Sequence, residues 1–193
     1  MLRIDYIVNR FYNSMTYILS KDNSDKVFLV DCGDVEKILK KIGGKRVVGV
    51  LLTHTHADHI YGISELLISF PEAIIYINEF GYKALASPKL NISRYHGEFD
   101  DISIEDRTNV RIISEKSCLN ILGHEVGVYE TPGHDPSCLT YKIEGYLFTG
   151  DSYIPGEKVF TKFPNSDKSQ ASKSERQILK MSEGLVVCPG HEV

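Results

Sequence analysis

The sequence predicts an α/β fold built from two similar halves, each containing strands followed by helix. Short apolar segments rich in β-branched residues recur in both halves, as buried strands do. Helical periodicity follows them, most clearly at residues 60–70 and 170–182. Polar residues come directly after several strands, where an α/β sheet carries its active site. We therefore expect two sheets packed together, with the helices outside.

The composition is that of an ordinary globular protein. The 193 residues are 42% hydrophobic and 25% charged, enough for one domain spanning residues 1–193 with a proper core. A net charge of -4 does not favour binding to nucleic acid, which usually needs a basic surface. We see no signal peptide or membrane span, and the four cysteines form no C-x-x-C pair. Free thiols and a cytoplasmic location are expected.

The first half is predicted to contain five strands and three helices. The strands are apolar segments bounded by polar turns, at residues 4–8, 15–20, 26–30, 47–52 and 73–77. The helices are expected at residues 35–42, 60–70 and 79–86. Gly43 and Gly44 end the first helix, and Pro71 ends the second. Residues 87–109 that follow are polar and irregular, which is typical of a functional or covering loop. We expect His96 in this loop to be exposed and without a role.

The second half is predicted to contain mostly strands and one helix. The strands are expected at residues 110–113, 120–122, 125–130, 138–143, 146–149 and 185–188. A hairpin turns at Glu144-Gly145. Residues 152–169 form a second irregular segment, and the helix at residues 170–182 follows it.

The segment at residues 53–59 reads Thr-His-Thr-His-Ala-Asp-His, the pattern H-x-H-x-D-H. If the segment is extended, alternation turns His54, His56 and Asp58 to the same side, and His59 joins them at the following turn. Solvated loop histidines would account for one of these residues, but not for three with an aspartate in fixed register. Imidazoles and carboxylates are metal ligands, so this loop predicts a metal site between a buried strand and a helix.

Three more strand ends offer metal ligands. They carry Gly133-His134, Gly150-Asp151 and Gly190-His191. Glycine before each polar residue lets the backbone turn sharply and direct the side chain inward. One such pair is usually only a turn, but three pairs together with the H-x-H-x-D-H loop indicate a dinuclear site.

Together these motifs resemble those of the metallo-β-lactamase-fold hydrolase superfamily. They are most similar to its glyoxalase II-like (hydroxyacylglutathione hydrolase-like) branch, from Asp31 through to His191. The resemblance implies a four-layer αβ/βα sandwich, with a dinuclear metal site at the edge between the two sheets. It also implies the ligands: His54, His56 and His134 for the first metal, Asp58, His59 and His191 for the second, and Asp151 as a bridge.

The donor chemistry favours two divalent ions, Zn²⁺ first, with Fe or Mn possible. Ions about 3.5–4 Å apart would share a water or hydroxide whose pKa falls towards about 7, so no serine or cysteine nucleophile is needed. Asp58 and Asp151 are the candidate catalytic residues, and Asp58 could orient the hydroxide. Asp31, at a strand end, is either a hydrogen-bond partner of a ligand imidazole or a turn or cap carboxylate.

Asp151 separates the possible reactions. The antibiotic-hydrolysing β-lactamases of the superfamily lack a bridging aspartate here, whereas its thioester, lactone and phosphodiester hydrolases have one. We expect a hydrolase of a small thioester or ester, with a lactonase or phosphodiesterase as alternatives. An iron persulfide dioxygenase fits less well, because that branch's Gly-Cys-Gly-Arg segment does not follow Asp151. A β-lactamase is also disfavoured, and a metalloprotein that does not hydrolyse is the alternative from another class.

The substrate is less well defined by the sequence. Lys158 and Lys162 could meet a substrate carboxylate or phosphate, although such lysines are more often solvated. Tyr153 could donate a hydrogen bond to a developing oxyanion, as a tyrosine near this position does in related lactonases, or it could simply be packed. Glyoxalase II carries a further C-terminal helical region that helps to hold glutathione, and this chain stops two residues after His191. A glutathione thioester is therefore one candidate among small-molecule substrates, and the oligomeric state is open.

Overall fold

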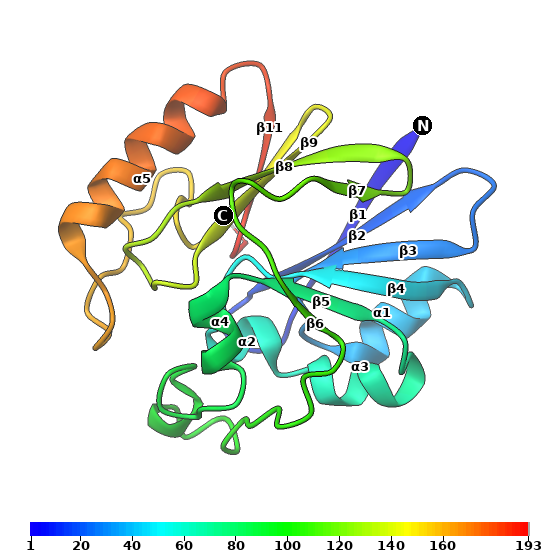
Figure 1. The fold of residues 1–193 in the computed structure, drawn as a ribbon, viewed down its shortest axis with the longest axis horizontal. Coiled ribbons are helices and arrows are strands. Elements are labelled where there is room, and N and C mark those ends of the chain that lie inside the picture. Colours follow the sequence, from blue (N-terminus) through cyan, green and yellow to red (C-terminus); the bar gives the residue numbers. More distant parts are fainter. Residues whose placement is uncertain (193) are drawn as a thin grey trace.

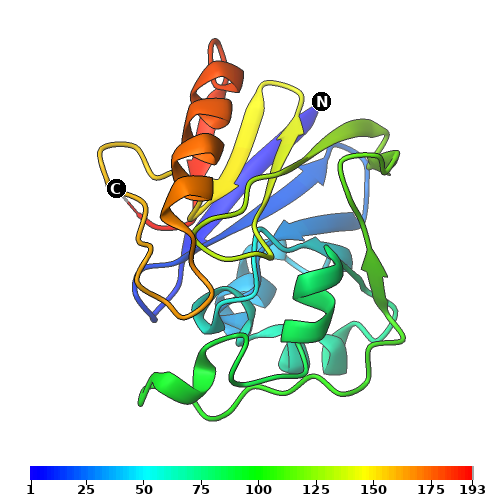
Figure 2. The ribbon, with the colours of Figure 1, turned by 60° about the vertical axis from the view of Figure 1, so that its left-hand side comes forward.

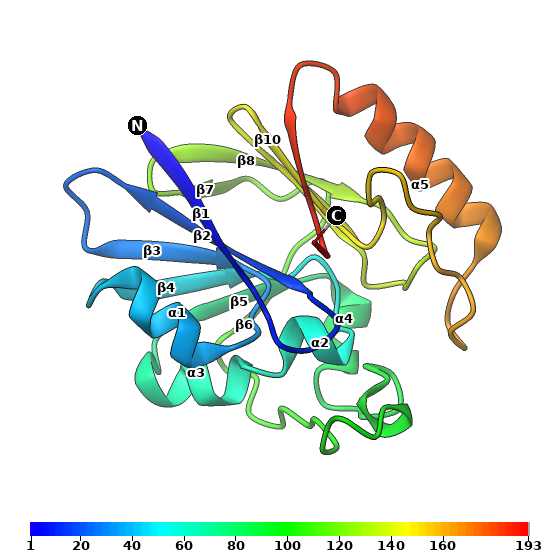
Figure 3. The ribbon, with the colours of Figure 1, turned by 180° about the vertical axis from the view of Figure 1, so that it is seen from behind.

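Two β-sheets face each other in the computed structural model, which describes residues 1–192 (Figure 1). The first sheet has the order β1-β2-β3-β4-β5-β6, and the second has the order β11-β10-β9-β8-β7. Helices lie on the outer face of each sheet (Figures 1 and 3). The predicted α/β architecture of two packed sheets is thus confirmed.

The first sheet combines antiparallel and parallel pairing. Its strands are β1 (Leu2–Val8), β2 (Met15–Lys21), β3 (Lys26–Val30), β4 (Arg46–Leu51), β5 (Ile74–Ile77) and β6 (Val110–Ile112). β1, β2 and β3 are antiparallel neighbours, whereas β3 to β6 run parallel. Its helices are α1 (Val35–Ile42), α2 (Ala57–Ile60), α3 (Ile63–Ser69) and α4 (Glu79–Ala84). Since β3 and β4 are parallel, the polar residues after them lie at one edge of the sheet.

The second sheet is antiparallel except at one edge. Its strands are β7 (Leu119–Ile121), β8 (His124–Glu130), β9 (Leu139–Ile143), β10 (Tyr146–Gly150) and β11 (Val186–Pro189). β11 pairs with β10 in parallel, so both strands end at the same edge. The single long helix, α5 (Lys168–Met181), covers the outer face of this sheet (Figure 2).

The space between the sheets is filled by aromatic and aliphatic side chains. The rings of Tyr17 and Phe148, one from each sheet, meet edge to face at 5.3 Å. The Tyr141 hydroxyl donates a hydrogen bond of 2.7 Å to the carbonyl of Leu52, and the Tyr17 hydroxyl donates one of 2.8 Å to Pro189. Buried tyrosine hydroxyls need such partners. These bonds tie the ends of β4 and β11 to the opposite sheet. They therefore hold the two sheets at a fixed distance from each other at the edge that carries the polar loops.

The helix expected at residues 60–70 is in fact two helices, α2 and α3. They are separated at Gly62, whose N–H donates a 3.0 Å hydrogen bond to the carbonyl of Cys32. A Cβ at position 62 would collide with the carbonyl oxygen of Gly33, so the close approach of the 32–33 backbone requires glycine. The break therefore comes from a contact with a distant segment, which periodicity cannot show.

Two other expectations need adjustment. Asp58 and His59 lie in the helical turn α2, so the segment is not extended as far as Asp58, and alternation does not place it. Helix α5 begins two residues earlier than expected because the Asp167 side chain accepts hydrogen bonds from the backbone N–H groups of Ser169 and Gln170. Among residues 1–192, no helix is both long and apolar enough to span a membrane.

Candidate metal centre

Four strand ends bring the predicted ligands to one place between the sheets. The loop after β4 carries His54 and His56, and α2 contributes Asp58 and His59. His134, Asp151 and His191 come from segments that follow β8, β10 and β11. The backbone bridge between Ser14 and His191 joins the β1–β2 loop to the end of β11. All seven predicted ligand side chains are buried or half-buried there.

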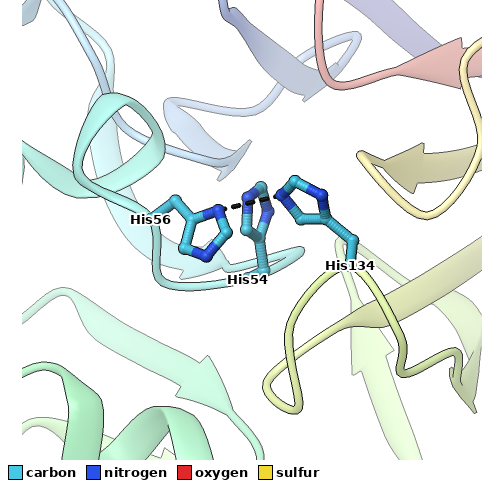
Figure 4. Close-up of side chains that lie close together, drawn as sticks. All are labelled: His54, His56 and His134. Carbon is cyan, nitrogen blue, oxygen red and sulfur yellow. Dashed lines mark hydrogen bonds between the residues drawn. The ribbon is translucent and has the colours of Figure 1, made fainter. Parts of the chain in front are cut away.

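The donor atoms form overlapping groups of three. Within each group the atoms lie within 4.8 Å of one another, and the groups are His54/His56/His134, His54/His59/Asp151 and Asp58/His59/His191. Figure 4 shows the first group, in which the imidazoles of His56 and His134 approach each other from different loops. Nδ1 of His56 lies 2.9 Å from Nε2 of His134. The three groups share members, so they form one continuous cluster.

Asp151 lies between the two outer groups. Its Oδ2 is 3.4 Å from Nε2 of His134 and 3.2 Å from Nε2 of His191. Its Oδ1 is 3.5 Å from Nε2 of His59. One carboxylate therefore faces imidazoles from both halves of the cluster, which is the arrangement that a bridging ligand needs.

Backbone carbonyls determine which nitrogen of His134 and His191 carries hydrogen. Nδ1 of His134 lies 2.8 Å from the carbonyl oxygen of Phe160, and Nδ1 of His191 lies 2.8 Å from that of Tyr12. A carbonyl oxygen only accepts hydrogen bonds, so Nδ1 must be the donor in both rings. When each ring is neutral, its Nε2 is then left with a lone pair that faces the cluster.

Asp31 and Thr53 orient two more rings in the same way. Oδ2 of Asp31 lies 3.0 Å from Nδ1 of His59, and Asp31 also accepts 2.7 Å hydrogen bonds from the N–H and hydroxyl of Thr53. Because the Thr53 hydroxyl gives its hydrogen to Asp31, its oxygen can accept from Nδ1 of His54, 3.1 Å away. His56 is reversed: its Nδ1 faces His134, and its Nε2 lies 3.5 Å from Oδ2 of Asp135.

Burial and charge give His134, His54 and Asp151 the protonation states that suit metal binding. Burial, assisted by the neighbouring His56, lowers the pKa of His134 to about 4. Burial, together with nearby His59, also lowers the pKa of His54 well below its ordinary value. Burial alone would raise the pKa of Asp151, but the neighbouring histidines outweigh it and hold that pKa well below its usual range. Neutral imidazoles and an ionised carboxylate are the forms that bind metal ions. In His59 and His191, burial acts to lower the pKa, but nearby carboxylates outweigh it and raise the pKa of both rings, so a metal ion would have to displace a proton there.

The residues present fit two metal ions. Among the described residues, His54 Nε2, His56 Nε2 and Asp151 Oδ1 are buried side-chain atoms with no hydrogen-bond partner. An unpartnered buried polar atom costs about 1–3 kcal/mol, so such atoms in one cluster call for a ligand. A bound cation would satisfy His54 Nε2 and Asp151 Oδ1. The donor set of imidazole with some carboxylate suits zinc and related divalent metals.

A cavity of about 320 Å³ opens beside the cluster. Besides five of the predicted ligands, its walls consist of Tyr12, Ile92, His96, Phe160 and Phe163. These wall residues come from the β1–β2 loop and from the two irregular segments, so both segments cover the site. The expectation of an exposed His96 is wrong: the residue is half-buried in the wall, with Nδ1 3.0 Å from the Tyr12 hydroxyl.

Not every candidate from the sequence reaches the site. Lys158 and Lys162 are exposed, and neither they nor Tyr153 are among the residues that line the cavity. Tyr153 is half-buried, and its backbone carbonyl accepts a 2.7 Å hydrogen bond from the Thr149 hydroxyl. Asp31, by contrast, contacts a ligand imidazole directly.

Sequence reasoning missed Asp135 and the aromatic walls. Asp135 directly follows His134 and accepts a 2.8 Å hydrogen bond from the N–H of Ser137. Its place beside a predicted ligand was a usable signal. Phe160 and Phe163 had no comparable signal, since only the folding of residues 152–167 brings them to the cluster.

Comparison with known proteins gives consistent results. The family model described as Metallo-beta-lactamase superfamily matches residues 9–191. The chain is 26% identical over 186 residues to a hydroxyacylglutathione hydrolase of Citrobacter koseri, and the match covers 94% of the chain but 63% of that protein. Two solved structures share the fold. BLEG-1 B3 metallo-beta-lactamase has a TM-score of 0.90 at 24% identity, covering 99% of this chain and 92% of its own. TTHA1623 in a di-iron-bound form has a TM-score of 0.80 at 20% identity, covering 98% and 92%.

Proposed function

Because the chain belongs to the metallo-beta-lactamase superfamily, we propose that it is a metal-dependent hydrolase that cleaves a small thioester or ester. The observation that carries the proposal is the Asp151 carboxylate, which lies between imidazoles of both halves of the histidine cluster. The name of the C. koseri relative supports a thioester substrate, although the chain spans only 63% of that protein's length. A lactone or a phosphodiester could be cleaved by the same chemistry.

We propose that the seven residues form two metal sites. His54, His56 and His134 would hold the first ion, Asp58, His59 and His191 would hold the second, and Asp151 would bridge them. When bound, the ions would supply Lewis-acid chemistry, lowering the pKa of an attacking water and polarising the substrate carbonyl. Zinc suits this donor set best. Iron is the second choice, since one structure of the same fold is in a di-iron-bound form.

The protein's own groups prepare the site before any substrate arrives. Acceptors at Nδ1 hold the rings of His59, His134 and His191 so that Nε2 faces the cluster. Oδ2 of Asp58 lies 3.3 Å from Nε2 of His59 and 3.4 Å from Nε2 of His191. This carboxylate lines the cavity, and we propose that it accepts a hydrogen bond from the attacking water and orients it. Groups held in place in advance need no costly rearrangement during the reaction.

Metal analysis combined with a hydrolysis assay tests the proposal. The purified full chain would be loaded with zinc, and its metal content measured beside its activity on S-lactoylglutathione and on a thioester of a simple neutral thiol. Two metal equivalents per chain and hydrolysis that a chelator abolishes would support the proposal. The proposal would be overturned if the protein bound one iron per chain, consumed oxygen when given a persulfide as substrate, and hydrolysed neither thioester.

A further inference from the structure

We propose that the cavity beside the cluster of predicted metal ligands selects substrates with an uncharged, apolar acyl group next to the scissile carbonyl. This inference rests on the proposed hydrolase function and names the substrate class of the same site. Three apolar side chains, Ile92, Phe160 and Phe163, line the cavity directly beside the predicted ligands. None of the described residues that line it is a lysine or an arginine. In these walls an anionic acyl group would find imidazoles but no lysine or arginine, so no permanently charged cation would replace the water that it loses.

The apolar wall is joined to the metal cluster. The Phe163 ring meets His56 edge to face at 4.7 Å, and it packs against Phe160 at the same centroid distance. The carbonyl of Phe160 accepts the hydrogen bond from Nδ1 of His134. An acyl group whose carbonyl lies at the cluster would consequently extend along these two rings.

The backbone conformation of Ile92 adds to this argument. Its φ of 60° is in the left-handed region, which is strained for a β-branched residue and favours glycine or asparagine instead. Its surroundings enforce this conformation: the buried Asn91 amide donates to the carbonyls of Ala84 and Ile102, and the N–H of Ser93 donates to Asn91 Oδ1. The strained backbone holds the isoleucine side chain in the cavity wall, 3% exposed. Strain of this kind collects at functional sites.

Two polar residues of the cavity wall that are not predicted ligands, Tyr12 and His96, contact each other. The Tyr12 hydroxyl donates a 2.9 Å hydrogen bond to Glu98 and lies 3.0 Å from Nδ1 of His96. Because its hydrogen goes to Glu98, the hydroxyl oxygen can accept from the imidazole, as the Thr53 hydroxyl does near His54. Tyr12 therefore offers the cavity mainly its ring. Lys158 and Lys162, the basic residues of the irregular segment at residues 152–169, are not among the residues that line the cavity.

A series of thioesters sharing one neutral thiol, N-acetylcysteamine, tests the inference on the zinc-loaded full chain. The acyl groups would be phenylacetyl, lactoyl and succinyl. We expect kcat/KM for the phenylacetyl ester to exceed both others by about tenfold or more, as good apolar contacts allow. Phe160→Ala should remove most of this advantage, lowering kcat/KM for the phenylacetyl ester much more than for the lactoyl ester. Phe160 is 48% exposed, so the protein should still fold.

Two further variants serve as controls. Phe160→Leu keeps an apolar wall and should keep the preference for the phenylacetyl ester. Lys162→Ala should leave kcat/KM unchanged for all three esters. If the lactoyl or succinyl ester is preferred, or if Phe160→Ala slows all esters equally, the inference is wrong while the hydrolase proposal stands. If the fully metal-loaded protein hydrolyses none of the esters and no S-lactoylglutathione, both proposals fail.

Discussion

Oδ2 of Asp31 lies 3.0 Å from Nδ1 of His59. The other ring nitrogen of His59, Nε2, faces the cluster of predicted metal ligands. Burial raises the pKa of this carboxyl, and the hydrogen bonds from His59 and Thr53 oppose the effect. Asp31 comes from the end of β3 and His59 from α2, so the contact joins two adjacent loops of the first sheet. It orients a predicted ligand, and Asp31 belongs to none of the three donor groups among the described residues.

We predict that Asp31→Asn weakens metal binding by about 10- to 100-fold, the range seen when a partner of a ligand histidine is lost. The amide can turn an N–H towards Nδ1, so it no longer enforces the tautomer that leaves Nε2 free. Competition with a chromogenic chelator measures the affinity. Asp34→Asn, which changes a carboxylate away from the cluster, should leave it unchanged. Equal affinities for wild type and Asp31→Asn would show that Asp31 does not orient His59.

Asp151→Ala should abolish the dinuclear site. Because Asp151 faces both halves of the cluster, its removal should reduce bound metal below two equivalents and lower kcat/KM by more than about a hundredfold. Metal content by mass spectrometry and thioester hydrolysis provide the two readouts. Asp22→Ala, at an exposed turn, is the control. A variant that keeps two metals and full activity would refute the bridging role.

Gly190→Ala should disturb the site through the backbone. A Cβ at position 190 would collide with Oδ1 of Asp151, so the carboxylate would have to move. We expect weaker metal binding, by about tenfold or more, in a protein with an unchanged circular dichroism spectrum. Gly145→Ala is the matched control, because a Cβ there would meet open space. If both variants bind metal as the wild type does, Asp151 is free to shift, and the close approach of Gly190 is unimportant.

Asp34 is expected to affect stability rather than metal binding. It accepts a 2.7 Å hydrogen bond from Tyr61, another of 3.0 Å from the N–H of Arg10, and pairs with Lys37 at 2.8 Å. Burial acts to raise the pKa of its carboxyl, but these partners outweigh burial and lower that pKa. Asp34→Asn should therefore reduce the free energy of unfolding by about 1–2 kcal/mol at pH 7.

The pH dependence follows from the sign of that shift. A carboxylate with a lowered pKa in the folded state stabilises the protein above the unfolded value, near 3.8, and loses this contribution as the pH falls through the folded value. Urea unfolding at pH 7 and pH 3 should thus show a difference between wild type and Asp34→Asn that shrinks in acid. A difference that is the same at both values would mean that the charge of Asp34 does not contribute.

Local signals predicted several elements closely. Helix α1 has the expected bounds because amphipathic spacing and the left-handed Gly43 are both local features. The sequence also predicted a role for the glycines at the three ligand-bearing strand ends, namely a sharp turn of the backbone. The structure shows two different roles. Gly133 and Gly150 have positive φ, whereas Gly190 provides room for the Asp151 side chain. Steric room of this kind depends on a neighbour from another segment, so the sequence does not reveal it.

The sequence by itself was enough to predict which side chains gather at the site, since residue type and short spacing mark histidines and aspartates at strand ends. Only the tertiary structure decided which nitrogen of each imidazole faces the cluster, because the acceptors on the other side, such as the carbonyls of Tyr12 and Phe160, come from distant loops. It also decided that His96 and Ile92 form a cavity wall while Lys162 stays outside. The physical reason is that ligand chemistry is carried by individual side chains, whereas tautomers and cavity walls are produced by packing between segments far apart in the chain.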